Sequence, residues 1–110
     1  MKPWTITIKN KKTYKGDGTY VGRPNALGNP FEIGRDGGRR EVIEKYRKWL
    51  TDEIRRDNAG MWMFVSLFDE VHEKGELILI CWCAPKECHA DVIKEFLMEA
   101  WEELSRDECP

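Results

Sequence analysis

No hydrophobic run in this 110-residue sequence approaches the roughly 20 apolar residues of a membrane-spanning helix, so no transmembrane segment is predicted. The first residues, Met1-Lys-Pro-Trp4, are not followed by the apolar segment of a secretory signal peptide, and we expect a cytoplasmic location by default. Cysteines in that reducing compartment are expected to be free, reactive or metal-bound rather than paired in disulfides.

A strong excess of one charge is also missing. Eighteen basic and 20 acidic residues leave a net charge of −2, so the overall charge gives no reason to expect nucleic-acid binding. A local basic patch is still compatible with this net charge. The sequence contains no internal repeat and no linker. With 41% hydrophobic and 35% charged residues, it is typical of a globular protein, and we predict one domain over residues 1–110.

The strand patterns lie near the start of the chain and in its last third. Residues 5–9 alternate and are rich in β-branched side chains, which predicts a strand, and residues 19–21 predict a second, short one. Residues 77–82 form a continuous apolar run without alternation, so we expect a strand that is buried on both faces.

Apolar residues three and four positions apart predict the helices. The pattern extends over residues 39–55 and from residue 90 to about residue 104. A third helix is predicted in the segment that Gly75 closes, although residues 61–65 also fit a strand. Together the elements predict an α/β fold, with a small, partly parallel sheet flanked by about three helices.

The most informative segment, Cys81-Trp-Cys83-Ala-Pro-Lys-Glu-Cys88-His89, joins the last predicted strand to the last predicted helix. Loops at the carboxyl ends of strands commonly carry ligands in open α/β sheets. A helix N-terminus at such a place attracts anions and favours thiolate over thiol. We therefore expect Cys88 to have a lowered pKa, and Asp91 suits the dipole of the first helical turn.

Three interpretations of this segment stay open. In the first, four side chains ligate zinc or an iron–sulfur cluster: Cys81, Cys83, Cys88 and His89. The paired C-x-x-C knuckles of most structural zinc sites are missing, however. In the second, a cysteine or His89 does chemistry, while Lys86 and the helix N–H groups hold an anion. In the third, Cys81 and Cys83 are small core residues and Cys88 caps the helix.

A second segment, Gly22-Arg-Pro-Asn-Ala-Leu-Gly-Asn-Pro-Phe31, predicts a rigid loop because prolines fix the chain and glycines permit close backbone approach. Arg23 and Asn29 are its candidate ligand-binding side chains, and arginine grips phosphate or carboxylate with a planar fork. The alternative is a structural clasp that plugs Leu27 and Phe31 into the core. The loop lacks the spacings of a P-loop and of a dinucleotide fingerprint.

Residues 20–31 and 81–91 together resemble domain-of-unknown-function family 4326, which occurs in prokaryotes and their phages. The resemblance extends over nearly the full length, with residues 56–76 matching in pattern only. It implies no particular reaction. It marks seven residues as family-motif positions: Arg23, Asn29, Cys81, Cys83, Cys88, His89 and Asp91.

We expect a small enzyme or binding protein that acts on a nucleotide-like or other phosphate-bearing ligand, at a site where the two motif segments converge on one edge of the sheet. The nucleotide is favoured by the phage occurrence of the resembled family. The candidate catalytic residues are Cys88, His89 and Asp91. The candidate ligand-binding residues are Arg23, Asn29, Lys86 and Trp82, of which Trp82 stacks on a base unless it belongs to the core. The alternative is a non-catalytic, metal-stabilised or nucleic-acid interaction module.

Overall fold

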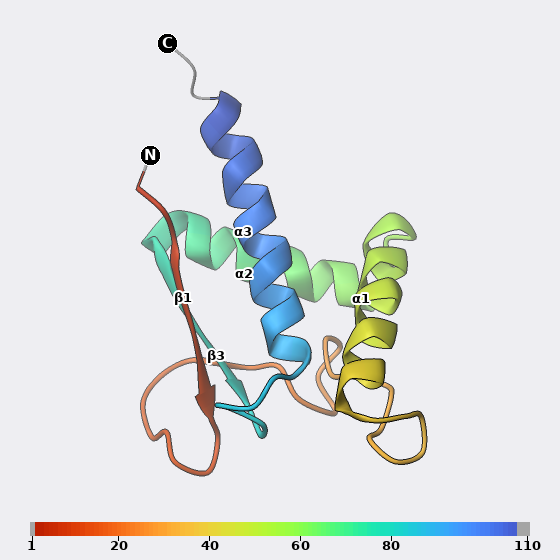
Figure 1. Ribbon diagram of the computed structural model, residues 1–110. Helices are drawn as coiled ribbons and strands as arrows, with labels where there is room; N and C mark the ends of the chain where they lie inside the picture. The colour runs from red at the N-terminus through yellow and green to blue at the C-terminus, as the bar shows by residue number, and fades with distance from the viewer. Residues whose placement is uncertain (1, 108–110) are drawn as a thin grey trace.

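Three parallel strands form a sheet in which the last strand of the chain lies in the middle. Figure 1 shows the first and the last strand side by side. The computed structural model describes residues 2–107. In chain order the elements are β1 (Thr5–Asn10), β2 (Thr19–Tyr20), α1 (Arg39–Arg55), α2 (Ala59–Lys74), β3 (Glu76–Cys81) and α3 (His89–Asp107). The predicted α/β fold is therefore confirmed. Within residues 2–107, none of the helices is long and apolar enough to cross a membrane.

The middle strand, β3, pairs with both of the others. Thr5 lies opposite Glu76 at one end of the β1–β3 ladder, and Asn10 lies opposite Cys81 at the other. The short strand β2 pairs along the second edge of β3. Because neighbouring parallel strands end at the same edge of a sheet, the segments that follow β2 and β3 begin side by side.

One face of the sheet and all three helices share a single hydrophobic core. The apolar helix faces that the sequence predicts are the faces buried in this core. Burial of such a face supplies most of the stability of a helix this short. The core residues with little or no exposed surface include Tyr46 and Leu50 of α1, Leu67 and Val71 of α2, Leu79 of β3, and Ile93 and Leu97 of α3.

The prediction that β3 is buried on both faces is wrong. Leu77 and Leu79 point into the core, whereas Ile78 and Ile80 are half-buried on the opposite face. Within residues 2–107 no helix packs on that face, and the chain around Gly18 lies against the two isoleucines instead. The side chains of β3 are apolar without alternation, but their burial alternates because the two faces of the strand have different surroundings.

The helix ends follow local signals. The bounds of α1 are those predicted, and the carboxylate of Glu41 accepts the backbone N–H of Gly38 at 3.0 Å just before its first turn. The end of α2 is set by Gly75, which has the left-handed φ of 77°. Residues 61–65 are helical, so the strand alternative for them is wrong.

The Gly22–Phe31 segment is clasped against α1. Leu27 is fully buried, and its carbonyl accepts a 2.7 Å hydrogen bond from the hydroxyl of Tyr46. A Cβ on Gly28 would lie 2.9 Å from the backbone nitrogen of Arg23, so only glycine fits there. The clasp interpretation is thus confirmed for Leu27, and it holds the loop in one position beside the end of β3.

Candidate functional site

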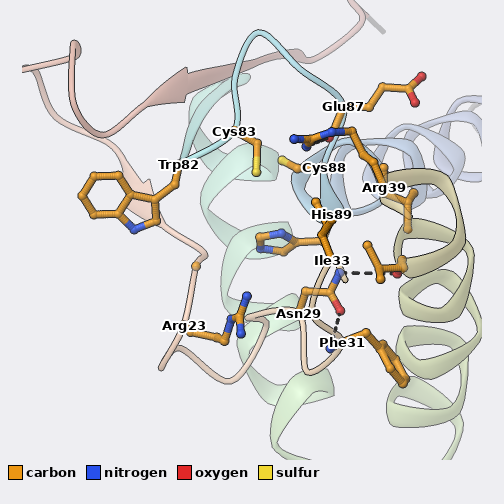
Figure 2. Close-up of a pocket in the computed structure, with 13 residues that line it drawn as sticks. Arg23, Asn29, Phe31, Ile33, Arg39, Trp82, Cys83, Glu87, Cys88 and His89 are labelled. Atoms are coloured by element: carbon orange, nitrogen blue, oxygen red, sulfur yellow. Dashed lines mark hydrogen bonds between the residues drawn. The ribbon is translucent and has the colours of Figure 1, made fainter. Parts of the chain in front are cut away.

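The two motif segments meet in a cavity of about 120 Å³ next to the carboxyl end of β3 (Figure 2). Its walls come from three places in the sequence. The Gly22–Phe31 segment provides Arg23, Asn29 and Phe31, the cysteine segment provides Trp82, Cys83, Cys88 and His89, and the start of α1 provides Arg39. The structure therefore shows the convergence that the sequence predicts.

His89 is held in one tautomer. It is the first residue of α3, only 8% exposed, and its Nε2 lies 2.7 Å from the carbonyl oxygen of Val21. Because a carbonyl only accepts hydrogen bonds, Nε2 carries the proton and Nδ1 keeps a lone pair. Burial lowers the pKa of His89, and the positive charge of Arg23 acts in the same direction. The imidazole is therefore neutral near pH 7.

Cys81 and Cys88 form a buried thiol pair with their sulfur atoms 3.4 Å apart. The Cys88 thiol donates to the Cys81 sulfur, which also accepts the backbone N–H groups of Cys83 and Ala84. These hydrogen bonds lower the pKa of Cys81 to about 6. Donation to Cys81, together with burial, raises the pKa of Cys88.

The expected lowered pKa of Cys88 is therefore reversed by the structure. The backbone N–H of Ala90 does favour the Cys88 thiolate, as a helix N-terminus should. The hydrogen bond to Cys81 outweighs it, because the pair shares one proton and Cys81 has the better set of donors.

Asp91 caps α3 and does not line the cavity. Its carboxylate accepts the backbone N–H of Cys88 at 2.9 Å, and its own N–H donates to the Cys88 carbonyl at 3.0 Å. The backbone N–H groups of Cys88 and Asp91 are thus engaged within the chain. Asp91 is a positioning residue for Cys88, and an anion site at this helix N-terminus stays a prediction.

Lys86 also lies outside the cavity, in a separate shallow hollow beside Lys94. The cation that takes its place is Arg39, which the sequence analysis missed. Its guanidinium donates to the carbonyl of Glu87 at 2.8 Å, and in Figure 2 it lies beside Cys88, with His89 between it and Arg23. One signal pointed to it: two arginines, Arg39 and Arg40, occupy a helix start where the dipole disfavours cations.

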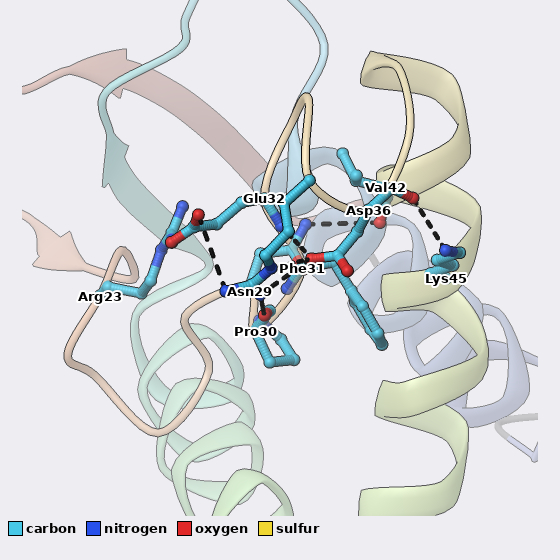
Figure 3. Close-up of polar contacts among 9 residues, drawn as sticks. Arg23, Asn29, Pro30, Phe31, Glu32, Asp36, Val42 and Lys45 are labelled. Carbon is cyan, nitrogen blue, oxygen red and sulfur yellow. Dashed lines mark hydrogen bonds and ion pairs between the residues drawn. The ribbon is translucent and has the colours of Figure 1, made fainter.

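Arg23 is the second cation of the cavity. Its guanidinium pairs with Glu32 at 2.9 Å, and its side chain is 57% exposed (Figure 3). An exposed ion pair of this kind is worth only about 0–1 kcal/mol, so an anionic ligand can compete for Arg23. Figure 2 shows the carboxylate of Glu87 pointing away from the cavity, so it does not offset the positive charge of Arg23 there.

Asn29 holds the loop in place. Its Oδ1 accepts the N–H of Phe31 at 2.9 Å, and its Nδ2 makes a long, 3.4 Å contact with the carbonyl of Val42 in α1 (Figures 2 and 3). Both groups of the amide are therefore engaged within the chain. Ligand binding by Asn29 stays a prediction, whereas its structural role is visible.

Trp82 is not a core residue. It is 52% exposed, because β3 ends at Cys81 and the chain then turns toward α3. Its indole Nε1 donates to the hydroxyl of Tyr20 at 2.9 Å, which holds the ring above the end of the sheet. The ring is thus accessible to a ligand, as base stacking requires.

The four expected metal ligands do not converge. His89 is turned toward Val21, and between residues 2 and 107 no group of three or more His, Cys, Asp or Glu side chains is placed to hold a metal ion. Zinc and iron–sulfur sites need such a group. Cys109 lies outside the described residues. The metal interpretation therefore finds no support in this donor set.

Comparison with protein families identifies the chain. The family described as domain of unknown function DUF4326 matches residues 6–99, which include both motif segments, so the chain belongs to this family. Neither the curated proteins nor the solved structures give a significant match. The resemblance noted from the two motif segments is confirmed.

Proposed function

For this member of the DUF4326 family, we propose that the cavity binds a nucleotide-like, phosphate-bearing ligand. The observation that carries this proposal is the presence of two guanidinium groups, Arg23 and Arg39, on either side of a neutral imidazole in a small cavity with apolar walls. Guanidinium forks match phosphate oxygens in geometry as well as charge. Apolar walls strengthen such contacts because they lower the local dielectric constant.

His89 supplies the acceptor of the site. Its Nε2 is engaged with Val21, and between residues 2 and 107 no hydrogen bond to Nδ1 is found. Its lowered pKa keeps Nδ1 unprotonated at neutral pH. We assign Nδ1 as the acceptor for a ligand hydroxyl or amine and as the general base where that proton leaves. Cys88 is less suited to act as the nucleophile, because its pKa is raised.

The volume of the cavity limits what enters it. About 120 Å³ is well below the roughly 300–1,000 Å³ of typical small-molecule sites. A nucleotide therefore places one of its parts inside, and we propose that its remainder lies along the exposed ring of Trp82. The cytoplasmic location and catalytic activity stay predictions.

Thermal denaturation with a panel of nucleoside 5′-monophosphates, the matching nucleosides and inorganic phosphate tests the proposal. A bound monophosphate should raise Tm, since a ligand at 100 times its Kd adds about 2.7 kcal/mol to the free energy of unfolding. Arg39→Ala should abolish the rise. Arg40→Ala is the matched control, because Arg40 neighbours Arg39 in α1 but does not line the cavity. An equal rise in both variants, or no rise with any monophosphate in the wild type, would contradict the proposal.

A further inference from the structure

The sheet face that no helix of residues 2–107 covers carries one exposed and two half-buried aromatic rings beside lysines. We call this the aromatic–lysine surface and define it by Tyr14, Tyr20, Trp82, Lys9 and Lys11. The ammonium of Lys11 lies 4.6 Å from the ring centre of Tyr20 and 6.0 Å from that of Trp82. The ammonium of Lys9 lies 5.9 Å from the ring centre of Tyr14. The lysine ammonium groups therefore lie next to the aromatic rings.

The register of the sheet places these residues on one face. Lys9 and Tyr20 both lie opposite Ile80, on either side of β3. Lys11 is two residues beyond Lys9, and its N–H donates to the carbonyl of Cys81 at 2.7 Å, which continues the β1–β3 ladder. Because side chains alternate along a strand, Lys9 and Lys11 share the uncovered face.

The charge of this surface differs from that of the whole chain. Residues 9–15 include four lysines and no acidic residue, in a protein of net charge −2. A concentration of positive charge on one surface attracts polyanions. Proteins that bind single-stranded nucleic acid combine such charge with aromatic rings, on which successive bases stack.

The aromatic–lysine surface is continuous with the cavity. Trp82 lines the cavity and donates to the Tyr20 hydroxyl, and that hydroxyl donates to the carbonyl of Arg23 at 2.7 Å. A single-stranded nucleic acid lying on this surface would therefore pass the mouth of the cavity, which is large enough for only one small group.

We propose that the aromatic–lysine surface binds single-stranded nucleic acid, with a base stacked on Trp82 and phosphates against Lys9 and Lys11. Trp82 is the main stacking residue, because its side chain is 52% exposed and Lys11 is farther from its ring than from that of Tyr20. The surface acts whether or not a free nucleotide binds in the cavity, so the two proposals fail separately.

Fluorescence anisotropy with labelled ten-nucleotide dT and rU strands at low salt tests this surface. Trp82→Ala should weaken binding by roughly 5- to 100-fold, the effect of losing one base–aromatic stack, and Trp82→Phe should restore most of it. Lys11→Ala should weaken binding and reduce the slope of log K against log salt by about 0.7. Circular dichroism should show all three variants folded, because the substituted side chains lie outside the core.

Two controls separate the surface from general effects. Trp62→Ala removes a more exposed tryptophan, 65% exposed on α2, and Lys48→Ala removes an exposed lysine on α1. Both should bind as the wild type does. The proposal is overturned if the wild type does not bind the strands, if it prefers a duplex of the same length, or if Trp82→Ala and Trp62→Ala lose affinity equally. Binding of monophosphates but not of strands would overturn this proposal and leave the cavity proposal intact.

Discussion

Two substitutions of His89 distinguish the role of its Nε2 hydrogen bond to Val21 from the role of its Nδ1 lone pair. His89→Ala removes both, and it leaves the carbonyl of Val21, a fully buried residue, without its 2.7 Å partner. An unsatisfied buried carbonyl costs roughly 1–3 kcal/mol. The lost contact with the edge-on ring of Tyr46, 5.1 Å away between centres, adds a cavity term. We therefore expect His89→Ala to lower the free energy of unfolding by roughly 2–4 kcal/mol.

His89→Gln is the matched variant. The Nε2 of glutamine is placed to donate to the Val21 carbonyl as the imidazole Nε2 does, but its acceptor, Oε1, does not occupy the position of Nδ1 and is not a base at neutral pH. Its free energy of unfolding should fall by only about 1 kcal/mol, which is less than in His89→Ala. Monophosphate binding or turnover that depends on Nδ1 should nevertheless be lost. Urea denaturation of the three proteins gives the stabilities, and the ligand panel gives the binding.

The pH dependence provides an independent readout. The pKa of His89 is lowered in the folded protein, so below pH of about 6.5 the unfolded chain binds a proton that the folded protein does not. The His89 contribution to stability is therefore lost as pH falls through this range, and His89→Gln should flatten that part of the profile. Equal stability of His89→Ala and wild type, or an unchanged pH profile in His89→Gln, would refute the buried neutral imidazole.

Three further changes test the surroundings of the cavity. The pKa of Cys81 is lowered to about 6, whereas the unfolded thiol holds its proton up to a pH of about 8.5. The free energy of unfolding should therefore rise between these two pH values, and Cys81→Ala should abolish the rise in urea titrations. Tyr46→Phe should cost roughly 1–3 kcal/mol in the same assay, because the buried Leu27 carbonyl loses its hydrogen bond, and a cost near zero would contradict the clasp. Gly28→Ala should lower Tm and monophosphate affinity together, whereas Gly38→Ala, with no atom closer than 3.6 Å to the new Cβ, should leave the affinity unchanged even if loss of a favourable N-cap lowers Tm.

The sequence by itself determined the elements whose signals are local. The 3.6-residue pattern and the turn at Gly75 set the helices, because each depends on neighbours within one or two turns. The convergence of the motif segments was also predictable. They follow β2 and β3, and the carboxyl ends of neighbouring parallel strands meet at one edge of the sheet.

Only the tertiary structure decided which side chains reach the cavity and in what protonation state. Lys86 and Arg39 are both cations near helix starts, and the path of the chain between β3 and α3 turns the first away while α1 brings the second in. The pKa order of Cys81 and Cys88 depends on backbone donors supplied by the turn after β3. The tautomer of His89 depends on Val21, 68 residues earlier in the chain. Contacts of this range leave no periodic pattern in the sequence, because they depend on how separate elements pack against one another.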